Sequence, residues 1–122
     1  VFKMIFDMVK TAVKALDSKK GIDIRVIKVQ DITSLADYFV ICSGSSSTQV
    51  KALADECEYQ MQQGGYEILH REGKGSGDWI LLDYKDIIVH VYNPKMREFY
   101  DLERFWKDGT QIDISEILGE NE

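Results

Sequence analysis

Residues 37–50 read Asp37-Tyr38-Phe39-Val40-Ile41-Cys42-Ser43-Gly44-Ser45-Ser46-Ser47-Thr48-Gln49-Val50, and they place a strand directly before a helix. Residues 38–43 have the aromatic and β-branched content of a buried strand. Ser46 and Gln49 stand at the spacing of a capping box, with a hydroxyl at the N-cap and an amide at N3. This segment predicts an α/β protein in which one central strand passes through a Gly/Ser turn into a helix.

The turn at Gly44 is a candidate phosphate site, because the N–H groups at a helix N-terminus lack partners and carry positive dipole. However, the chain has no GxxxxGK[ST] motif, and no lysine follows the turn. The acids Asp55, Glu56 and Glu58 fall within a helical pattern, so we expect them to point in different directions rather than to chelate one Mg²⁺. We interpret the turn as a helix-capping joint. A nucleotidyltransferase-type enzyme that uses the Gly44 turn remains the alternative.

Outward from this joint, hydrophobic periodicity predicts the remaining elements. Apolar residues at helical spacing predict a helix of about five turns from Phe2, a second from about Ser47 to Gln63, and a third that starts at Asn93-Pro94. Apolar runs predict strands at 22–29, 38–43, 66–70, 79–83 and 87–92, with an added edge strand at 110–114. The order predicts an α/β (α+β) fold: a mixed sheet of about five strands, one parallel element, and helices packed on it. We expect one domain over residues 1–118 and a flexible acidic tail over 119–122.

Composition narrows the classes of partner. The net charge is −6, which suits contact with nucleic acid poorly and a basic protein well, although solubility alone also explains it. No window holds 18 continuous apolar residues, so we expect no membrane span. Cys42 and Cys57 form no CxxC pair and are interpreted as small buried residues. Neither His70 nor His90 has a metal ligand at the usual spacing, so we expect no metal, no cofactor and no catalytic group.

The second half of the chain is rich in the residue types that anchor protein interfaces. Within some 28 residues it holds six aromatic residues: Trp79, Tyr84, Tyr92, Phe99, Tyr100 and Trp106. Lys95, Arg97 and Arg104 lie among them. Such aromatic residues also stack on nucleic-acid bases, but the negative net charge of the chain favours a protein partner over RNA. Trp106 is predicted to lie in the core, because it falls on the inner stripe of the last helix.

With these motifs in view, the chain resembles the ribosomal silencing factor family, also called Iojap-like proteins, over about residues 2–109. The resemblance rests on many short matches in one order: Asp31, Ser34, residues 37–46, Gln49-Val50, Glu72-Gly73, residues 79–83, Asp86, residues 89–92, Arg97 and residues 100–106. It implies a nucleotidyltransferase-like α/β fold without the catalytic acids.

The resemblance also implies a function. Family members bind a basic protein on the inter-subunit face of the large ribosomal subunit, number fourteen in its series, and block joining of the small subunit when nutrients are short. We therefore expect a cytoplasmic, non-enzymatic translation repressor. Family members often form homodimers, for which the sheet edge or the apolar hairpin offers a surface.

The predicted partner surface is the hairpin together with the start of the last helix. Its anchors are Trp79, Leu81, His90, Tyr92, Arg97 and Tyr100. Acidic residues that would meet the partner's lysines and arginines are Asp78, Asp83, Glu98 and Asp101.

Overall fold

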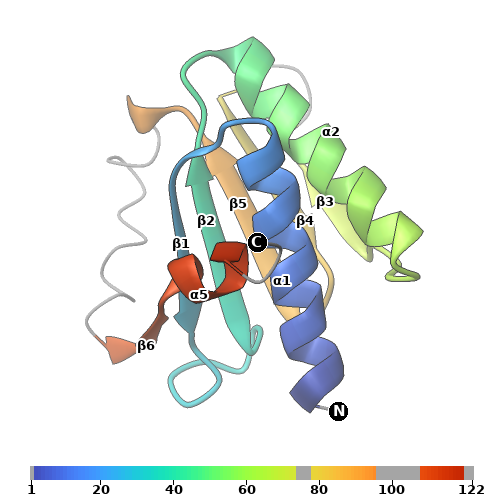
Figure 1. Cartoon of the computed structure of the whole chain (residues 1–122), viewed down its shortest axis with the longest axis vertical. Helices are drawn as coiled ribbons and strands as arrows, with labels where there is room; N and C mark the ends of the chain where they lie inside the picture. Colours follow the sequence, from blue (N-terminus) through green and yellow to red (C-terminus); the bar gives the residue numbers. More distant parts are fainter. Residues whose placement is uncertain (1, 74–77, 96–107, 120–122) are drawn as a thin grey trace.

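The computed structural model describes residues 2–73, 78–95 and 108–119. Two long helices and a sheet make up most of the chain (Figure 1). Along the chain the elements are α1 (Phe2–Ser18), β1 (Ile22–Lys28), β2 (Tyr38–Ser43), α2 (Ser47–Gln63), β3 (His70–Glu72), β4 (Trp79–Asp83), β5 (Ile87–Tyr92), β6 (Thr110–Ile112) and α5 (Ile114–Gly119).

The sheet has six strands in the order β3-β4-β5-β2-β1-β6. β2 and β5 pair in parallel, and every other neighbouring pair is antiparallel. The mixed α/β class, the central place of β2, the parallel element and the hairpin of β4 and β5 are confirmed. The prediction of about five strands was one short, because β6 adds the edge strand that the sequence offered as an extra.

One predicted strand was wrong. Of residues 66–70 only His70 belongs to a strand, because β3 spans His70–Glu72. Tyr66 and Ile68 pack against the hydrophobic core from the segment that joins α2 to β3. Their alternation with polar neighbours therefore reflects packing of a connection.

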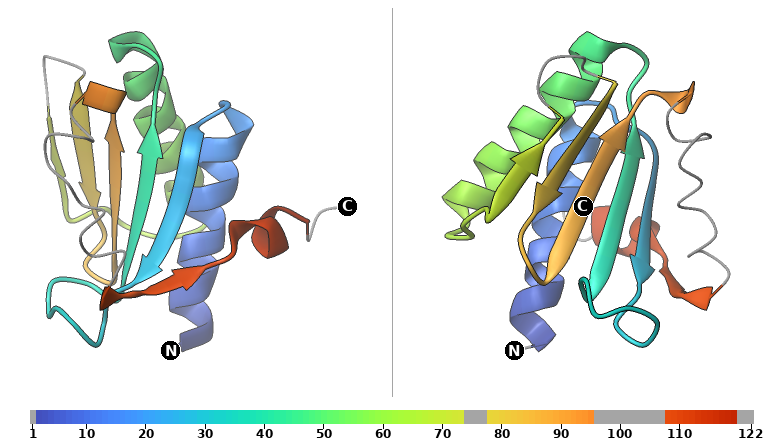
Figure 2. Two further views of the ribbon diagram at one scale, coloured as in Figure 1. Left: turned by 90° about the vertical axis from the view of Figure 1, so that its left-hand side faces the viewer. Right: turned by 180° about the vertical axis from the view of Figure 1, so that it is seen from behind.

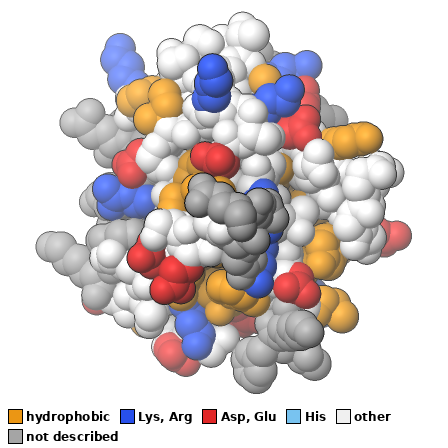
Figure 3. Space-filling model, viewed as in Figure 1, with side chains coloured by type: hydrophobic (Ala, Val, Ile, Leu, Met, Phe, Trp, Pro, Cys, Tyr) orange, Lys and Arg blue, Asp and Glu red, His pale blue; other side chains and the backbone are white. Residues whose placement is uncertain are grey.

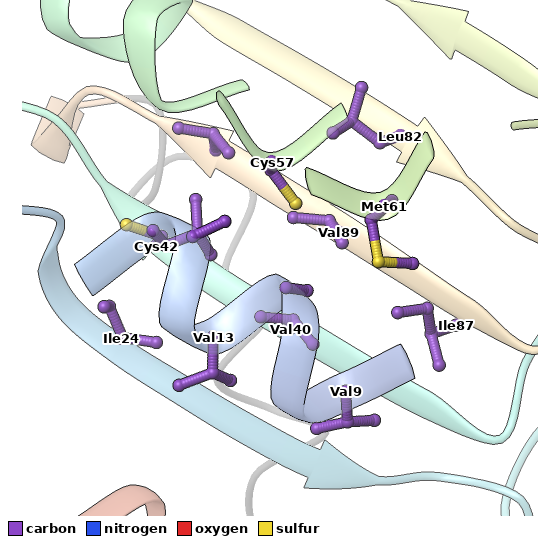
Figure 4. Close-up of a cluster of buried hydrophobic side chains, with 14 of the residues drawn as sticks. Val9, Val13, Ile24, Val40, Cys42, Cys57, Met61, Leu82, Ile87 and Val89 are labelled. Atoms are coloured by element: carbon purple, nitrogen blue, oxygen red, sulfur yellow. The ribbon is translucent and has the colours of Figure 1, made fainter. Parts of the chain in front are cut away.

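Helices α1 and α2 pack side by side on one face of the sheet, and seen from behind the strands lie in front of both helices (Figure 2). Val9 and Val13 of α1, Cys57 and Met61 of α2, and Val40 of β2 belong to one buried cluster (Figure 4). The predicted apolar stripe of α2 is confirmed in full, since Val50, Leu53, Ala54, Cys57 and Met61 are all buried. Cys42 is buried in the same cluster, as expected for a small apolar residue.

The outer surface of this helical side is mixed. Acidic and basic side chains are interspersed over it, with small apolar areas between them (Figure 3). Among the described residues, no helix combines the length and the apolar character needed to cross a membrane.

Two predictions reach beyond the described residues. Pro94 and Lys95 are helical, which agrees with a helix start at Asn93-Pro94, but residues 96–107 lie outside the described part, and with them the inner stripe and Trp106. The acidic tail lies outside it as well, apart from Gly119. The single-domain boundary therefore stays a prediction.

Candidate protein-binding face

The antiparallel pairing of β4 with β5 brings four of the predicted anchors together. Trp79 lies opposite Tyr92, and Leu81 lies opposite His90. Because alternate residues of a strand point to the same face, all four belong to one face of the sheet. Trp79, Leu81 and Tyr92 belong to a hydrophobic cluster separate from the core under the helices. We call this surface the open face, since the helices α1, α2 and α5 of the described part of the chain all pack with the other cluster.

Two neighbouring strands extend the open face. Phe39 and Ile41 of β2 and Ile27 of β1 belong to the same cluster. The sequence analysis missed them, because it interpreted residues 38–43 as buried without assigning a face. The signal that finds them is the register: Ile41 lies opposite His90 in the parallel pair of β2 and β5, so residues 39 and 41 share the face of His90.

The four anchors differ in how accessible they are. Tyr92 is 1% exposed and His90 is 7% exposed, whereas Trp79 and Leu81 are half-buried. Trp79 and Leu81 are therefore the accessible members of the set, whereas the side chains of His90 and Tyr92 are buried on the same face.

His90 sits in an aromatic environment. Its ring is 5.2 Å from that of Phe39 in an edge-on arrangement and 6.0 Å from that of Tyr92. Within the described part of the chain, neither ring nitrogen has a hydrogen-bond partner. Burial disfavours the charged imidazolium and lowers the pKa of His90 from its ordinary 6.5 to about 4. His90 is thus neutral at physiological pH and acts as an aromatic residue of the open face.

The two acidic candidates on β4 hold the ends of that strand in place. The Asp78 carboxylate accepts a hydrogen bond from the Asn93 side chain at 2.9 Å, and the Asp78 carbonyl oxygen accepts one from the Asn93 N–H. The Asp83 carboxylate accepts from the N–H of Lys85 at 2.8 Å in the β4–β5 turn. Both remain half-buried rather than hidden, so they place negative charge at the two ends of β4, on either side of Trp79 and Leu81 in the sequence.

The other four predicted partner residues, Arg97, Glu98, Tyr100 and Asp101, lie outside the described residues.

The candidate phosphate turn is filled by the chain itself. Ser46 is the N-cap of α2, and its hydroxyl accepts from the Gln49 N–H at 3.1 Å, which confirms half of the predicted capping box. The other half differs, because the Gln49 carbonyl oxygen accepts from the N–H and hydroxyl of Ser45 instead of from the Ser46 N–H. The N–H of Gly44 donates to the Tyr92 carbonyl oxygen. Three of the backbone donors around the turn, the N–H groups of Gly44, Ser45 and Gln49, are therefore engaged within the protein.

The acids after the turn also have partners. Asp55 and Glu58 share Arg71, at 2.8 and 3.2 Å, while Glu56 accepts from Gln60. Asp55 and Glu58 thus face the same way, contrary to our expectation that all three diverge, but a guanidinium lies where a metal would be. Over residues 2–73, 78–95 and 108–119, no three His, Cys, Asp or Glu side chains are grouped as a metal site.

Comparison with known proteins identifies the family of the chain. The family model described as "Ribosomal silencing factor during starvation" matches residues 3–122. The chain is 34% identical to a ribosomal silencing factor of Halalkalibacterium halodurans, over 92% of this chain and 96% of that protein. It is 31% identical to the chloroplastic Iojap protein of Zea mays, over 83% of this chain but 44% of that protein.

A solved structure shares the fold. The crystal structure of a protein from Chromobacterium violaceum superposes with a TM-score of 0.82 at 38% identity, covering 84% of this chain and 86% of the other. The family model spans nearly all of the chain, and the similar sequences and the similar structure agree with it. This chain belongs to the ribosomal silencing factor family.

Proposed function

We propose that this protein is a non-enzymatic translation repressor that binds the large ribosomal subunit through its protein number fourteen and blocks joining of the small subunit under nutrient limitation. Membership of the ribosomal silencing factor family supports a ribosome-associated regulatory role. The partner and the steric block are our proposal, as is action in the cytoplasm, where the subunits join. A homodimer stays a prediction.

One observation carries the proposed contact surface: the pairing of Trp79 with Tyr92 and of Leu81 with His90 on the open face. Tryptophan at the centre of a contact, surrounded by residues that exclude water, is the usual anchor of a protein interface. Here Trp79 and Leu81 make the direct contact, and the buried Tyr92 and His90 support them from the neighbouring strand β5. Arg97 and Tyr100 complete the proposed set of anchors.

Charge supports a basic protein as the partner. Asp78 directly precedes β4 and Asp83 ends it, and the whole chain carries a net charge of −6. Such a surface attracts lysine and arginine side chains and repels a phosphate backbone. Glu98 and Asp101 are proposed to add to this acidic border.

The test is co-sedimentation of purified protein with isolated large subunits. Trp79→Ala should weaken association by at least tenfold, because truncating a central aromatic anchor typically costs about 2 kcal/mol or more. Tyr59→Ala is the matched control, since Tyr59 is an exposed aromatic residue of α2, on the helical side of the sheet. It should bind like the wild type.

Both variants must keep the wild-type unfolding midpoint in urea, so that a loss of binding is not a loss of fold. Unchanged co-sedimentation of a folded Trp79→Ala protein would overturn the proposed surface. A contact with RNA instead of protein would appear as a steep loss of affinity with salt.

A further inference from the structure

A pocket of about 610 Å³ opens on the helical side of the sheet, away from the open face. Its lining residues come from the C-terminal half of α2, the segment that follows α2, and the β4–β5 turn. Its volume is in the range of sites that hold small molecules. The proposed contact surface uses none of the residues that line it.

The pocket wall contains a buried polar group without a partner. Tyr84, which lines the pocket, is 4% exposed, and its hydroxyl has no hydrogen-bond partner among the described residues. Burial, and then the neighbouring Cys57 and Glu58, raise the pKa of Tyr84, so the phenol stays protonated. A buried hydroxyl without a hydrogen-bond partner destabilises a protein, and buried polar groups of this kind are rare in native structures. A ligand that forms a hydrogen bond with the hydroxyl would explain its presence here.

The charges of the pocket favour a cation. Glu58 and Glu67 both line it. The nearby cation Arg71 is already shared between Glu58, at 3.2 Å, and Asp55, at 2.8 Å. The carboxylates therefore outnumber the positive charge, and an anion such as a nucleotide is disfavoured.

The apolar residues that line the pocket favour a cation that carries an alkyl chain. Tyr66 and Ile68 line the pocket and pack against the hydrophobic core. Aromatic rings attract ammonium groups through their negative faces and also cover methylene groups. Carboxylates, aromatic rings and an aliphatic side chain together match an alkyl ammonium ion better than they match a hydrated metal ion, which prefers a shell of oxygen atoms.

We propose that this pocket binds a small organic cation of the polyamine class, that is, an alkyl chain ending in a primary ammonium group. Glu67 and Glu58 hold the ammonium group, and the Tyr84 hydroxyl oxygen accepts a hydrogen bond from one of its N–H groups. The methylene groups lie against Tyr66 and Ile68. Since the Tyr84 oxygen is covered in the free protein, binding includes a small movement of a wall side chain. Tyr66 is half-buried and also lines the pocket, so its ring is a candidate for this movement.

The experiment is isothermal titration of the full chain with spermidine at about 0.15 M salt, where weak surface charge effects are largely screened. Wild-type protein should bind one equivalent saturably. Tyr84→Phe removes only the hydroxyl, and Glu67→Gln removes only the exposed charge. Each should weaken binding about tenfold, as expected for loss of a hydrogen bond or ion pair to a charged group.

Glu116→Gln is the matched control. Glu116 is an exposed carboxylate of α5, which contacts α1 and β1 rather than the pocket. This variant loses the same charge and should bind spermidine like the wild type. A second readout separates ligand binding from packing: Tyr84→Phe should unfold at the same or a higher urea concentration than the wild type, because no hydrogen bond is lost in the free protein.

The proposal is overturned by the absence of saturable binding in the millimolar range. It is also overturned if Glu116→Gln weakens binding as much as Glu67→Gln, or if Mg²⁺ competes at equal concentration, since either result means diffuse counter-ion binding. The pocket is separate from Trp79, so these results do not depend on the outcome of the co-sedimentation test.

Discussion

The side-chain amide of Gln49 donates a hydrogen bond to the carbonyl oxygen of Lys20 at 3.1 Å, and it thereby joins the start of α2 to the end of α1. The carbonyl oxygen of the same side chain accepts from Ser45 in the turn. Gln49→Ala should therefore lower the free energy of unfolding by about 1–2 kcal/mol, because several backbone groups lose their partner at once. Urea denaturation measures this as a lower midpoint with an unchanged slope.

The neighbouring Thr48→Ala is the control for Gln49. Thr48 is an exposed residue of the same helical turn, and its truncation should change stability by less than about 0.5 kcal/mol. Equal effects of the two substitutions would show that the link between the helices contributes nothing specific.

Gly73 and Gly65 form a matched pair at which the same substitution should have different costs. Both have a positive φ, 96° and 87°. A Cβ atom at Gly73 would collide with the backbone of Trp79, whereas one at Gly65 meets nothing within 4 Å. We expect Gly65→Ala to cost about 1 kcal/mol, from backbone strain alone. Gly73→Ala should cost about 2 kcal/mol or more.

Gly73→Ala should also weaken co-sedimentation with large subunits, since it displaces the start of β4 and with it Trp79. Thermal unfolding gives the two stabilities. If Gly65→Ala proves the more harmful of the two, the close approach of Gly73 to β4 is contradicted.

His90 predicts a pH dependence. Its pKa is about 4 in the folded protein and about 6.5 when unfolded. The unfolded chain therefore binds a proton that the folded protein does not, and stability falls as the pH drops from about 6.5 toward 4. Through His90, the free energy of unfolding should be about 2 kcal/mol lower at pH 5 than at pH 7.5.

Urea midpoints at these two pH values test the role of His90. His90→Phe, which keeps an aromatic ring beside Phe39 and Tyr92, should remove this part of the pH dependence. His70→Gln should retain it, because His70 is exposed. A pH dependence that survives in His90→Phe would assign the effect to other groups.

Arg71 should stabilise the packing of β3 against α2. Its side chain is 21% exposed and pairs with both Asp55 and Glu58, whereas Lys51 is 70% exposed and lies 3.8 Å from Asp55. We expect Arg71→Ala to cost about 1–2 kcal/mol, through lost ion pairs and lost packing of its aliphatic part. Lys51→Ala should cost less than about 0.5 kcal/mol. Chemical denaturation at low and high salt distinguishes the ionic part from the packing part.

The elements with a strong local signal were predictable from the sequence. The stripe from Val50 to Met61 repeats at the helical period, and the Ser46 hydroxyl has few structural roles other than a cap at that position. β4 and β5 were predictable because a three-residue turn, residues 84–86, separates two apolar runs. In these places local propensity and the final packing agree.

The remainder depends on contacts between distant segments. Nothing near Tyr66 shows that the alternation there serves packing rather than strand pairing, because both bury alternate residues. The face occupied by Trp79 follows from its pairing with Tyr92, and a strand that is apolar at nearly every position does not specify that register locally. The pocket at Tyr84 joins three segments, so no single stretch of sequence predicts it.

The strand order has a consequence for how the protein is made. β5 lies between β4 and β2, so the apolar edge of β2 has no partner until residues 44–87 have been synthesised. At ordinary rates of translation this takes roughly 2–9 s. During that interval the nascent chain exposes an unpaired strand edge, which is prone to wrong pairing with other chains. The early helix α1 packs against β2, so it can cover one face of that strand, but not this edge, before the sheet is complete.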